Sequence, residues 1–518
     1  MAGPRAKRIN IPLRRVAVAC AVLLFALLAN LTCLQAFRAR GLNADPRNER
    51  ALLARYEHPR GDILTYDGRT VATSRATDTG PYRHRRVHTG GETYAPVTGH
   101  LFLNRATGIE HAEDAVLAGH DARVRMRALV KDGASEGADV RLTIRDRIQR
   151  TAYESLARVG SPGAAVALDP VTGAILALAS YPSYDPGAFA SQDTAALAAA
   201  ERRLREDPSR PLLNRALHRT YPPGPSFELV TTAAALASGE YTIASQIDAS
   251  DPHLPPPAPP APAQASPPST EEAAAPLSGP PVSSPGPSVS SPGPSVSSSS
   301  PAASLPDAEG RVCGDGRPSL AYAFRLSCGT AFANLGLQLG QDLLRDQAEA
   351  FGFGVPDLRI PIPVAASTYP ATLDRPGTAL SAVGLHADRA TPLMIAMLSA
   401  AVANGGVLMW PYLVEEVRLP DGSIINRSVP TPYRTVMSPA LAGQLAILMA
   451  TTTQPSAPAA ALVLPGVEVA AKTGSGPPAV VTAFAPATAP EVAVAVVLER
   501  TPASASQIAR AILQAALA

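Results

Sequence analysis

The sequence of 518 residues predicts an α+β protein that follows an N-terminal membrane helix. A run of apolar residues at 16–34 is the first observation. The second is a pair of apolar runs within 164–179, joined by a loop that contains proline and glycine, which predicts a β-hairpin. The third is a valine-rich strand pattern at 491–499, followed by a helical pattern at 506–517 with one apolar face. Together these patterns indicate a mixed α and β domain.

Residues 16–36 are expected to form a single-pass transmembrane signal anchor. The apolar run is just long enough to span a bilayer. Five basic residues precede it, and the positive-inside rule then places residues 1–15 in the cytoplasm as a tail. These basic residues are Arg5, Lys7, Arg8, Arg14 and Arg15. The protein is therefore expected in the cell membrane with most of its chain outside. A cleaved signal peptide is the alternative, although no small-residue cleavage site follows the run.

Composition excludes several classes of function. A net charge of +2 gives no indication of nucleic-acid binding. The nine histidines show no metal-ligand spacing and no phosphate-binding glycine loop is present, so neither a metal nor a cofactor is expected. Lysine occurs only at Lys7, Lys131 and Lys472. Chemistry that requires a lysine outside the membrane can therefore use only the last two.

Two of the four cysteines lie outside the predicted anchor, at Cys313 and Cys328. An oxidising exterior permits a disulfide between them. A loop of that length would contribute about 3 kcal/mol to stability in the chain-entropy model. Two free buried thiols are the alternative.

The part beyond the anchor is too long for one ordinary core. A first domain is expected at 37–155. Its residues 61–72 have the pattern of two short strands joined by an Asp-Gly turn. A second domain is expected at 156–518. Within it, residues 250–308 are dominated by proline, serine and alanine, and such a composition predicts a disordered insertion because it cannot bury enough apolar surface.

The segment Pro225-Ser226-Phe227-Glu228, with its flanks Thr220-Tyr221-Pro222-Pro223-Gly224 and Leu229-Val230-Thr231-Thr232, resembles the active-site segment of class B penicillin-binding proteins. In that family the segment carries Ser-x-x-Lys. The resemblance implies a mostly β non-catalytic domain, then a transpeptidase-like domain with an antiparallel sheet covered by helices. It also implies a place in peptidoglycan synthesis.

The catalytic positions of this segment are degenerate. Acyl transfer needs an attacking hydroxyl, a base and two backbone N–H groups that hold the oxyanion. Pro225, at the nucleophile position, has neither hydroxyl nor N–H. Losing one oxyanion donor costs about 3 kcal/mol of transition-state stabilisation. Glu228, at the base position, reverses the charge of lysine. Proline is tolerated in the first helical turn, so the helix is expected to survive.

Ser226 is the candidate for a displaced nucleophile. A shift by one residue rotates a side chain by about 100° around a helix, and the residue three positions further is Leu229 rather than a base. Ser226 is instead expected to satisfy a backbone donor at the helix start.

The second family motif, Ser-x-Asn, reads Ser327-Cys328-Gly329 here. Gly329 lacks the amide that helps to hold the substrate peptide in the family. The third motif is intact.

In the family, the side chains of this third motif engage the carboxylate of penicillin or of the stem peptide, and its last N–H is the second oxyanion donor. Its residues are Lys472, Thr473, Gly474 and Ser475. With Ser327, these are the predicted substrate-binding residues.

The resulting hypothesis is a membrane-anchored, catalytically inactive partner or regulator in cell-wall synthesis, and the sequence favours a non-enzyme. Its expected partners are membrane proteins of that pathway, together with a peptidoglycan stem peptide or β-lactam bound non-covalently. The alternative is an active D,D-transpeptidase that binds penicillin covalently through a displaced serine. A Glu228–Lys472 ion pair is also predicted; its alternative is a Glu228 side chain that turns to solvent.

Overall fold

The computed structural model describes residues 5–35, 56–78, 82–102, 105–130, 136–191, 193–252, 254, 313, 316–356, 358–501 and 504–518. The insertion predicted at 250–308 lies almost wholly outside these residues. So does the start of the predicted first domain, up to residue 55.

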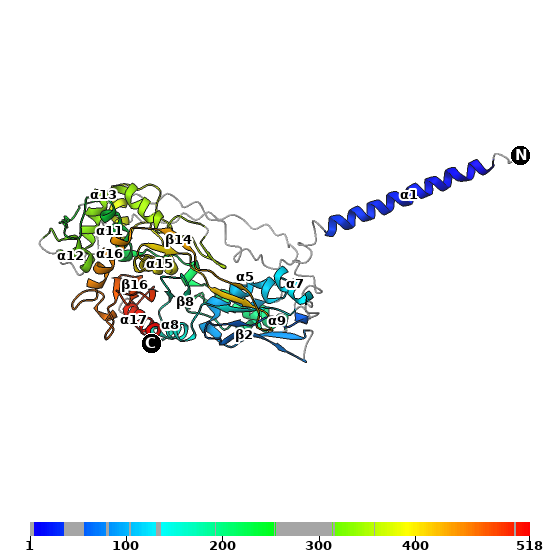
Figure 1. The fold of residues 1–518 in the computed structure, drawn as a ribbon, viewed down its shortest axis with the longest axis horizontal. Coiled ribbons are helices and arrows are strands. Elements are labelled where there is room, and N and C mark those ends of the chain that lie inside the picture. Colours follow the sequence, from blue (N-terminus) through cyan, green and yellow to red (C-terminus); the bar gives the residue numbers. More distant parts are fainter. Residues whose placement is uncertain are drawn as a thin grey trace, which may run out of the picture.

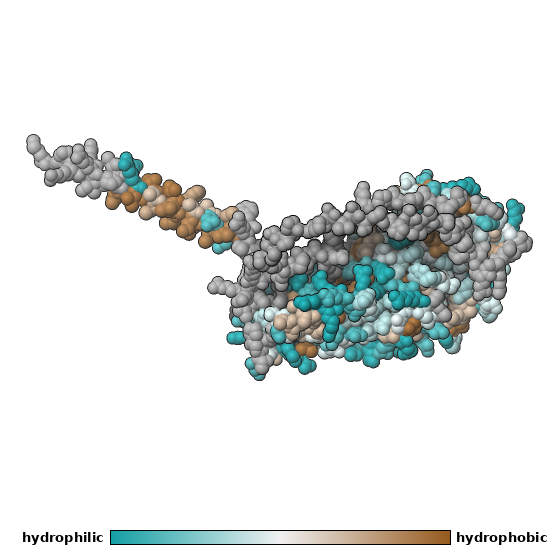
Figure 2. Space-filling model, turned by 180° about the vertical axis from the view of Figure 1, so that it is seen from behind, coloured by the Kyte–Doolittle hydropathy of each residue, from teal (hydrophilic) through white to brown (hydrophobic). Residues whose placement is uncertain are grey.

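The N-terminal helix α1 (Arg5–Cys33) extends away from the folded body (Figure 1). Its segment Leu13–Cys33 is long and apolar enough to cross a bilayer, and it is fully exposed in the protein. This segment appears brown in Figure 2, whereas the coloured surface of the folded body is largely hydrophilic. The observed apolar helix therefore begins and ends about one turn before the predicted anchor.

The first sheet has six strands in the order β13-β12-β6-β1-β2-β3. The bounds are β1 (Ile63–Leu64), β2 (Thr70–Ala76), β3 (His84–His88), β6 (Asp139–Leu142), β12 (Val414–Arg418) and β13 (Ile424–Arg427). The predicted hairpin is present, since β1 and β2 pair antiparallel around a turn in which Gly68 has φ of 81°. Two of the six strands come from residues 414–427, which the sequence assigns to the second domain.

Short helices accompany the first sheet. They are α4 (Ala95–Thr98), α5 (Gly108–Ala112), α6 (Asp114–Leu117) and α7 (Ala122–Val130). The small strands β4 (Leu101–Phe102) and β5 (Arg105–Ala106) pair beside them. The N-terminal region is therefore a mixture of strands and short helices.

The second sheet has five antiparallel strands in the order β15-β16-β17-β7-β8. The bounds are β7 (Gly163–Leu168), β8 (Ile175–Tyr181), β15 (Ala470–Gly474), β16 (Ala479–Ala485) and β17 (Val492–Leu498). Both the predicted hairpin at 164–179 and the predicted strand at 491–499 are confirmed. Almost every residue of these strands is buried, because helices cover both faces.

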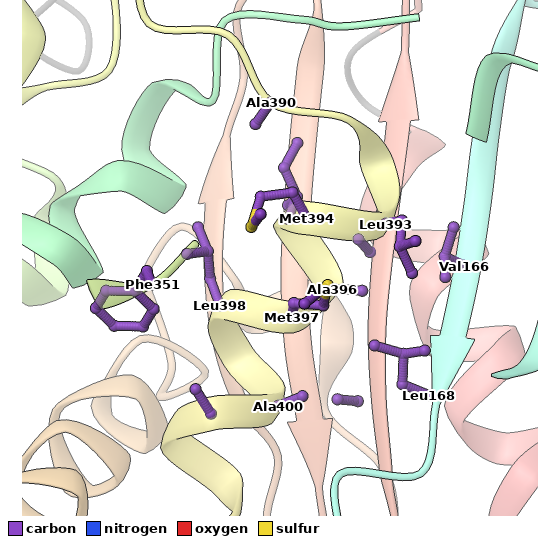
Figure 3. Close-up of a cluster of buried hydrophobic side chains, with 14 of the residues drawn as sticks. Val166, Leu168, Phe351, Ala390, Leu393, Met394, Ala396, Met397, Leu398 and Ala400 are labelled. Carbon is purple, nitrogen blue, oxygen red and sulfur yellow. The ribbon is translucent and has the colours of Figure 1, made fainter. Parts of the chain in front are cut away.

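Helices α8 (Asp146–Val159) and α17 (Ala505–Leu517) pack on one face of this sheet, and Ile508 and Ile512 point into it as predicted. On the other face lies α15 (Pro392–Ala403), which is apolar on all sides and almost entirely buried. Figure 3 shows its Leu393 beside Val166 of β7. The hydroxyl of Thr391 accepts a hydrogen bond from the N–H of Met394 and so caps α15.

The remaining elements connect the two sheets and the helices on them or pack around their outside. They are η2 (Gly91–Thr93), η3 (Pro186–Phe189), α9 (Thr194–Glu206), α10 (Arg215–His218), η4 (Gly224–Phe227), α11 (Glu228–Ala237), α12 (Leu320–Leu326), α13 (Gly329–Ala350), β9 (Arg359–Ile360), β10 (Ile362–Pro363), α14 (Arg375–Ala382), β11 (Val407–Met409), β14 (Pro432–Thr435), α16 (Pro439–Thr451) and η6 (Ala460–Leu462). Helix α11 lies beside α13 and α16, close to the free edge of the second sheet.

Candidate functional site

The segment that carries Pro225 forms a short 3-10 turn, η4, which leads directly into α11. Proline suits the start of this turn, since its φ is already close to the helical value and its missing N–H has no partner there. The helix therefore forms without the residue types that the family uses for chemistry.

The ring of Pro225 packs against the edge strand β15. A Cβ atom placed on Gly474 would lie 2.6 Å from Cδ of Pro225 and 3.2 Å from its Cγ. Cδ is bonded to the proline nitrogen in the position where other residues carry a hydrogen. A methylene group therefore stands where the family resemblance predicts the backbone donor of an oxyanion hole.

Ser226 does not face this edge. Its side chain is buried, and its hydroxyl donates a hydrogen bond of 2.6 Å to the carbonyl of Pro223. The expectation that this hydroxyl satisfies a backbone donor is wrong, because inside the tight turn it reaches a carbonyl three residues back, which also accepts the N–H of Ser226. The hydroxyl is neither exposed nor next to a base.

Glu228, the first residue of α11, meets Lys472 of β15. The distance between Lys472 Nζ and Glu228 Oε2 is 2.6 Å, and both side chains are at most 1% exposed. The predicted ion pair is thus present, and Glu228 does not turn to solvent. The angles of the Lys472–Glu228 contact fall outside those of a hydrogen bond. Within the described part of the chain, neither carboxylate oxygen of Glu228 therefore accepts a hydrogen bond.

Burial dominates the electrostatics of this pair. It raises the pKa of Glu228 to about 7, against the opposing effect of the Lys472 ammonium. Burial also lowers the pKa of Lys472, while Glu228 acts to raise it. Both shifts have the sign expected when a charge is removed from water.

The Lys472 ammonium is also held by the segment of the second motif. Nζ donates to the carbonyl of Phe324 over 2.5 Å and lies 4.0 Å from the centre of its ring. The ring of Phe332, on α13, is 5.8 Å away. The same Phe324 carbonyl accepts from the N–H of Ser327. The carbonyl oxygen of Phe324 therefore links Lys472 to the second motif.

The second motif occupies the break between α12 and α13. Ser327 closes α12 in the left-handed region, with φ of 54° and ψ of 58°, and Gly329 begins α13. Cys328 is bonded to Cys313, and their Cα atoms lie 5.9 Å apart. The structure therefore contains the disulfide that the sequence permits, rather than two free thiols.

The rest of the third motif lies at the end of the edge strand. Thr473 and Gly474 are half-buried, and Ser475 is exposed just beyond β15. These residues stay available to a ligand, whereas Lys472 does not. The third motif thus offers two accessible hydroxyls at the strand end, but its lysine is paired with Glu228.

Comparison with known proteins agrees with this architecture. The model of the penicillin binding protein transpeptidase domain matches residues 163–262 and 299–518. The model of the penicillin binding protein A dimerisation domain matches residues 60–140. This chain belongs to the class B penicillin-binding proteins.

Relatives within this penicillin-binding protein family cover nearly the whole chain. Peptidoglycan D,D-transpeptidase PbpA of Mycolicibacterium smegmatis is 40% identical over 95% of this chain and 94% of its own length. The protein of that name from Mycobacterium tuberculosis is 38% identical over 98% of this chain and 99% of its own length. The structure of penicillin-binding protein A from M. tuberculosis, an imipenem acyl-enzyme complex, has a TM-score of 0.76 and 37% identity. It covers 90% of this chain and 100% of that one.

Two parts of the site could not be found from the sequence. The contact of Pro225 with Gly474 joins residues about half the chain apart, and no pattern marks it. The role of Phe324 rests on its backbone carbonyl, which every residue has. Only its aromatic ring, three residues before Ser327, gave a signal that could have been used.

Proposed function

We propose that this chain is a membrane-anchored, non-catalytic member of its family that acts as a partner or regulator in peptidoglycan synthesis. The observation that carries the proposal is the buried Glu228–Lys472 pair beneath a proline at the nucleophile position. The nucleophile, the base and one oxyanion donor are replaced together. A small movement of one neighbouring side chain could therefore not restore catalysis, because it could supply only one of the three.

The relative from M. tuberculosis shows how a reactive member of the family differs from the non-catalytic chain proposed here. Its structure carries imipenem as an acyl-enzyme, so that protein forms a covalent bond with a β-lactam. Pro225 offers no atom for such a bond. The remaining candidate, Ser226, is buried and hydrogen-bonded to Pro223, and no geometric feature favours the displaced-nucleophile alternative.

We further propose that ligands bind this site without reaction. Thr473, Ser475 and Ser327 remain partly or fully exposed around the strand end. These groups can hydrogen-bond a stem peptide or a β-lactam, but the ligand carboxylate would lack the lysine ammonium. Such binding is expected to be weak, because charge-assisted hydrogen bonds are about twice as strong as neutral ones.

The partners in this proposal are membrane proteins of cell-wall synthesis. The apolar helix Leu13–Cys33 anchors the chain in the same membrane, with the folded body on the outer side. The region at 37–155, which includes the matched dimerisation domain, is the surface that we assign to protein contacts.

Genetic complementation tests the non-catalytic role. A strain that lacks this chain would receive either the wild type or Ser226→Ala, and growth, cell shape and wall cross-linking would be compared. Equal restoration at equal membrane levels is expected, because no serine acts as a nucleophile. Failure of a folded, membrane-inserted Ser226→Ala variant would instead support the active transpeptidase.

A further inference from the structure

Two buried carboxylates in this protein face cations in very different ways. Glu110 accepts hydrogen bonds from the Nε atoms of Arg60 and Arg86, at 2.7 and 2.5 Å. Although burial acts to raise its pKa, the two guanidinium groups lower the pKa of Glu110 to about 2. This carboxylate stays ionised, and an arginine beside it cannot act as a nucleophile because its charge is permanent.

Glu228 has the opposite environment. One ammonium group touches it, and within the described residues no donor forms a hydrogen bond of good geometry to either oxygen. Desolvation raises the pKa of Glu228 to about 7 and lowers the pKa of Lys472. Both shifts lower the free-energy cost of moving a proton from the ammonium to the carboxylate, the step that would give a neutral amine beside a neutral carboxylic acid.

We propose that Lys472 and Glu228 condense to form an intramolecular amide bond. The proton moves from Nζ to Oε2, and the nitrogen lone pair then attacks the carboxyl carbon of Glu228. The C–N bond forms, the C–O bond to the protonated oxygen breaks, and a second proton from the nitrogen leaves with that oxygen as water. Ammonium and carboxylate thus give one amide and one water, with no oxidant, reductant or external reactant.

The geometry supplies what this reaction lacks in open solution. Well-oriented intramolecular groups react as if at an effective molarity of about 10⁵–10⁸ M. The Nζ atom is already 2.6 Å from a carboxyl oxygen, and both side chains are shielded from water. The rings of Phe324 and Phe332 lie beside the nitrogen. Exclusion of water disfavours hydrolysis of the product.

The carbonyl of Phe324 orients the nitrogen. It accepts one N–H of Lys472 before the reaction and can accept the amide N–H afterwards, so the nitrogen keeps its hydrogen-bond partner throughout. The reaction replaces two charges in an apolar site by one neutral amide. This removes the desolvation penalty that a buried ion pair carries.

The bond would join α11 to the edge strand β15 and fix the first motif against the third. It is a separate claim from the loss of catalysis, for which the ion pair and Pro225 suffice. Absence of the bond would therefore leave the proposed function untouched, and covalent penicillin binding would overturn the function independently.

Peptide mapping of the full-length protein tests the proposal. The protein is purified, held at neutral pH, denatured, reduced and digested with a glutamate-specific protease. The relevant cleavage sites are Glu206, Glu228, Glu240, Glu468 and Glu491. If the amide is present, cleavage after Glu228 is blocked. One branched species then contains residues 207–240 and 469–491, lighter than their sum by one water.

The control is Lys472→Arg, which keeps the positive charge but has no amine to acylate. It should yield residues 207–228, 229–240 and 469–491 as separate peptides. Because the digest is read on denatured chains, the wild-type result decides the question whether or not the variant folds. Free peptides from the wild type, both fresh and after incubation, would overturn the proposal.

Discussion

The two sides of the candidate site have changed to very different degrees. On the strand side, β15 and the residue that follows it keep Lys472-Thr473-Gly474-Ser475, the sequence that binds the substrate carboxylate in the family. On the helix side, η4 and α11 carry Pro225 and Glu228 at the positions that the family resemblance predicts for the nucleophile and base. Yet the two sides still contact each other, through Pro225 and Gly474 and through Glu228 and Lys472.

This difference separates the demands of folding from those of catalysis. A helix start needs a residue with suitable φ and no unmet donor, and Pro225 meets that need. A buried lysine needs an anion or a hydrogen-bond acceptor, and Glu228 supplies the anion. Both residues satisfy the fold, and in the proposed function they also remove the chemistry. In that proposal, the retained third motif is evidence of ancestry and structure rather than of activity.

The largest effect is expected when one member of the buried pair is removed. Lys472→Met leaves the Glu228 carboxylate without its cation, and the free energy of unfolding should fall by about 3–5 kcal/mol. The matched control is the double variant Lys472→Met with Glu228→Met, which should recover most of the loss. Urea unfolding of detergent-solubilised protein measures both. If Lys472→Met alone were as stable as the wild type, the pairing of Glu228 with Lys472 would be contradicted.

The disulfide should have the next largest effect. Cys313 and Cys328 close a loop with a sequence separation of 15. Replacing both by alanine should lower the free energy of unfolding by about 3 kcal/mol, because the unfolded chain gains conformational entropy. Reduction of the wild type should give the same shift. No change on reduction would mean that the bond does not constrain the second motif.

A smaller effect is expected where the proline ring meets the strand. Gly474→Ala places a methyl group against Pro225 and should cost about 1–3 kcal/mol, as overpacking does. Adding Pro225→Ala should restore part of that stability. Gly443→Ala is the matched control, because a Cβ atom there meets nothing within 4 Å. Equal losses of unfolding free energy for Gly474→Ala and Gly443→Ala would contradict the proposed contact between the helix side and the strand side.

Measured over a single pH unit, the pH dependence of stability is the smallest effect. The folded pKa of Glu228, about 7, exceeds its usual value of 4.5. The folded state therefore holds a proton that the unfolded state releases, and the stability from this proton is fully present below pH 4.5 and lost as pH rises through 7. Unfolding free energies should fall by about 1 kcal/mol per pH unit in this window relative to Glu228→Gln. Because an amide between Glu228 and Lys472 would abolish this titration, the curves are taken on protein whose peptide map shows a free Glu228. Parallel curves for the two proteins would then refute the shift.

Much of the architecture could be predicted from local patterns. The hairpin at 164–179, the strand at 491–499 and the C-terminal helix follow from apolar periodicity, because their contacts are local or repeat along one face. The addition of β12 and β13 to the first sheet could not be predicted. Strand pairing between residues such as Val417 and Val140 depends on the folded path of the whole chain.

The candidate site was also predictable only in part. The family resemblance predicted that Pro225 and Glu228 stand at the nucleophile and base positions. It also predicted that Glu228 faces Lys472, because the family places its two lysines around one pocket, and the ion pair confirms that prediction. The direction of the Ser226 hydroxyl could not be obtained, because a 3-10 turn and an α-helix offer a serine different backbone groups.

Labelling of the purified full-length protein with a fluorescent penicillin tests the central claim most directly. The wild type should show no covalent band after denaturing electrophoresis, because Pro225 has no nucleophilic atom. The double variant Pro225→Ser with Glu228→Lys, run beside it, should become labelled if the pocket keeps its shape. A band on the wild type would contradict the account and return the search for a nucleophile to Ser226.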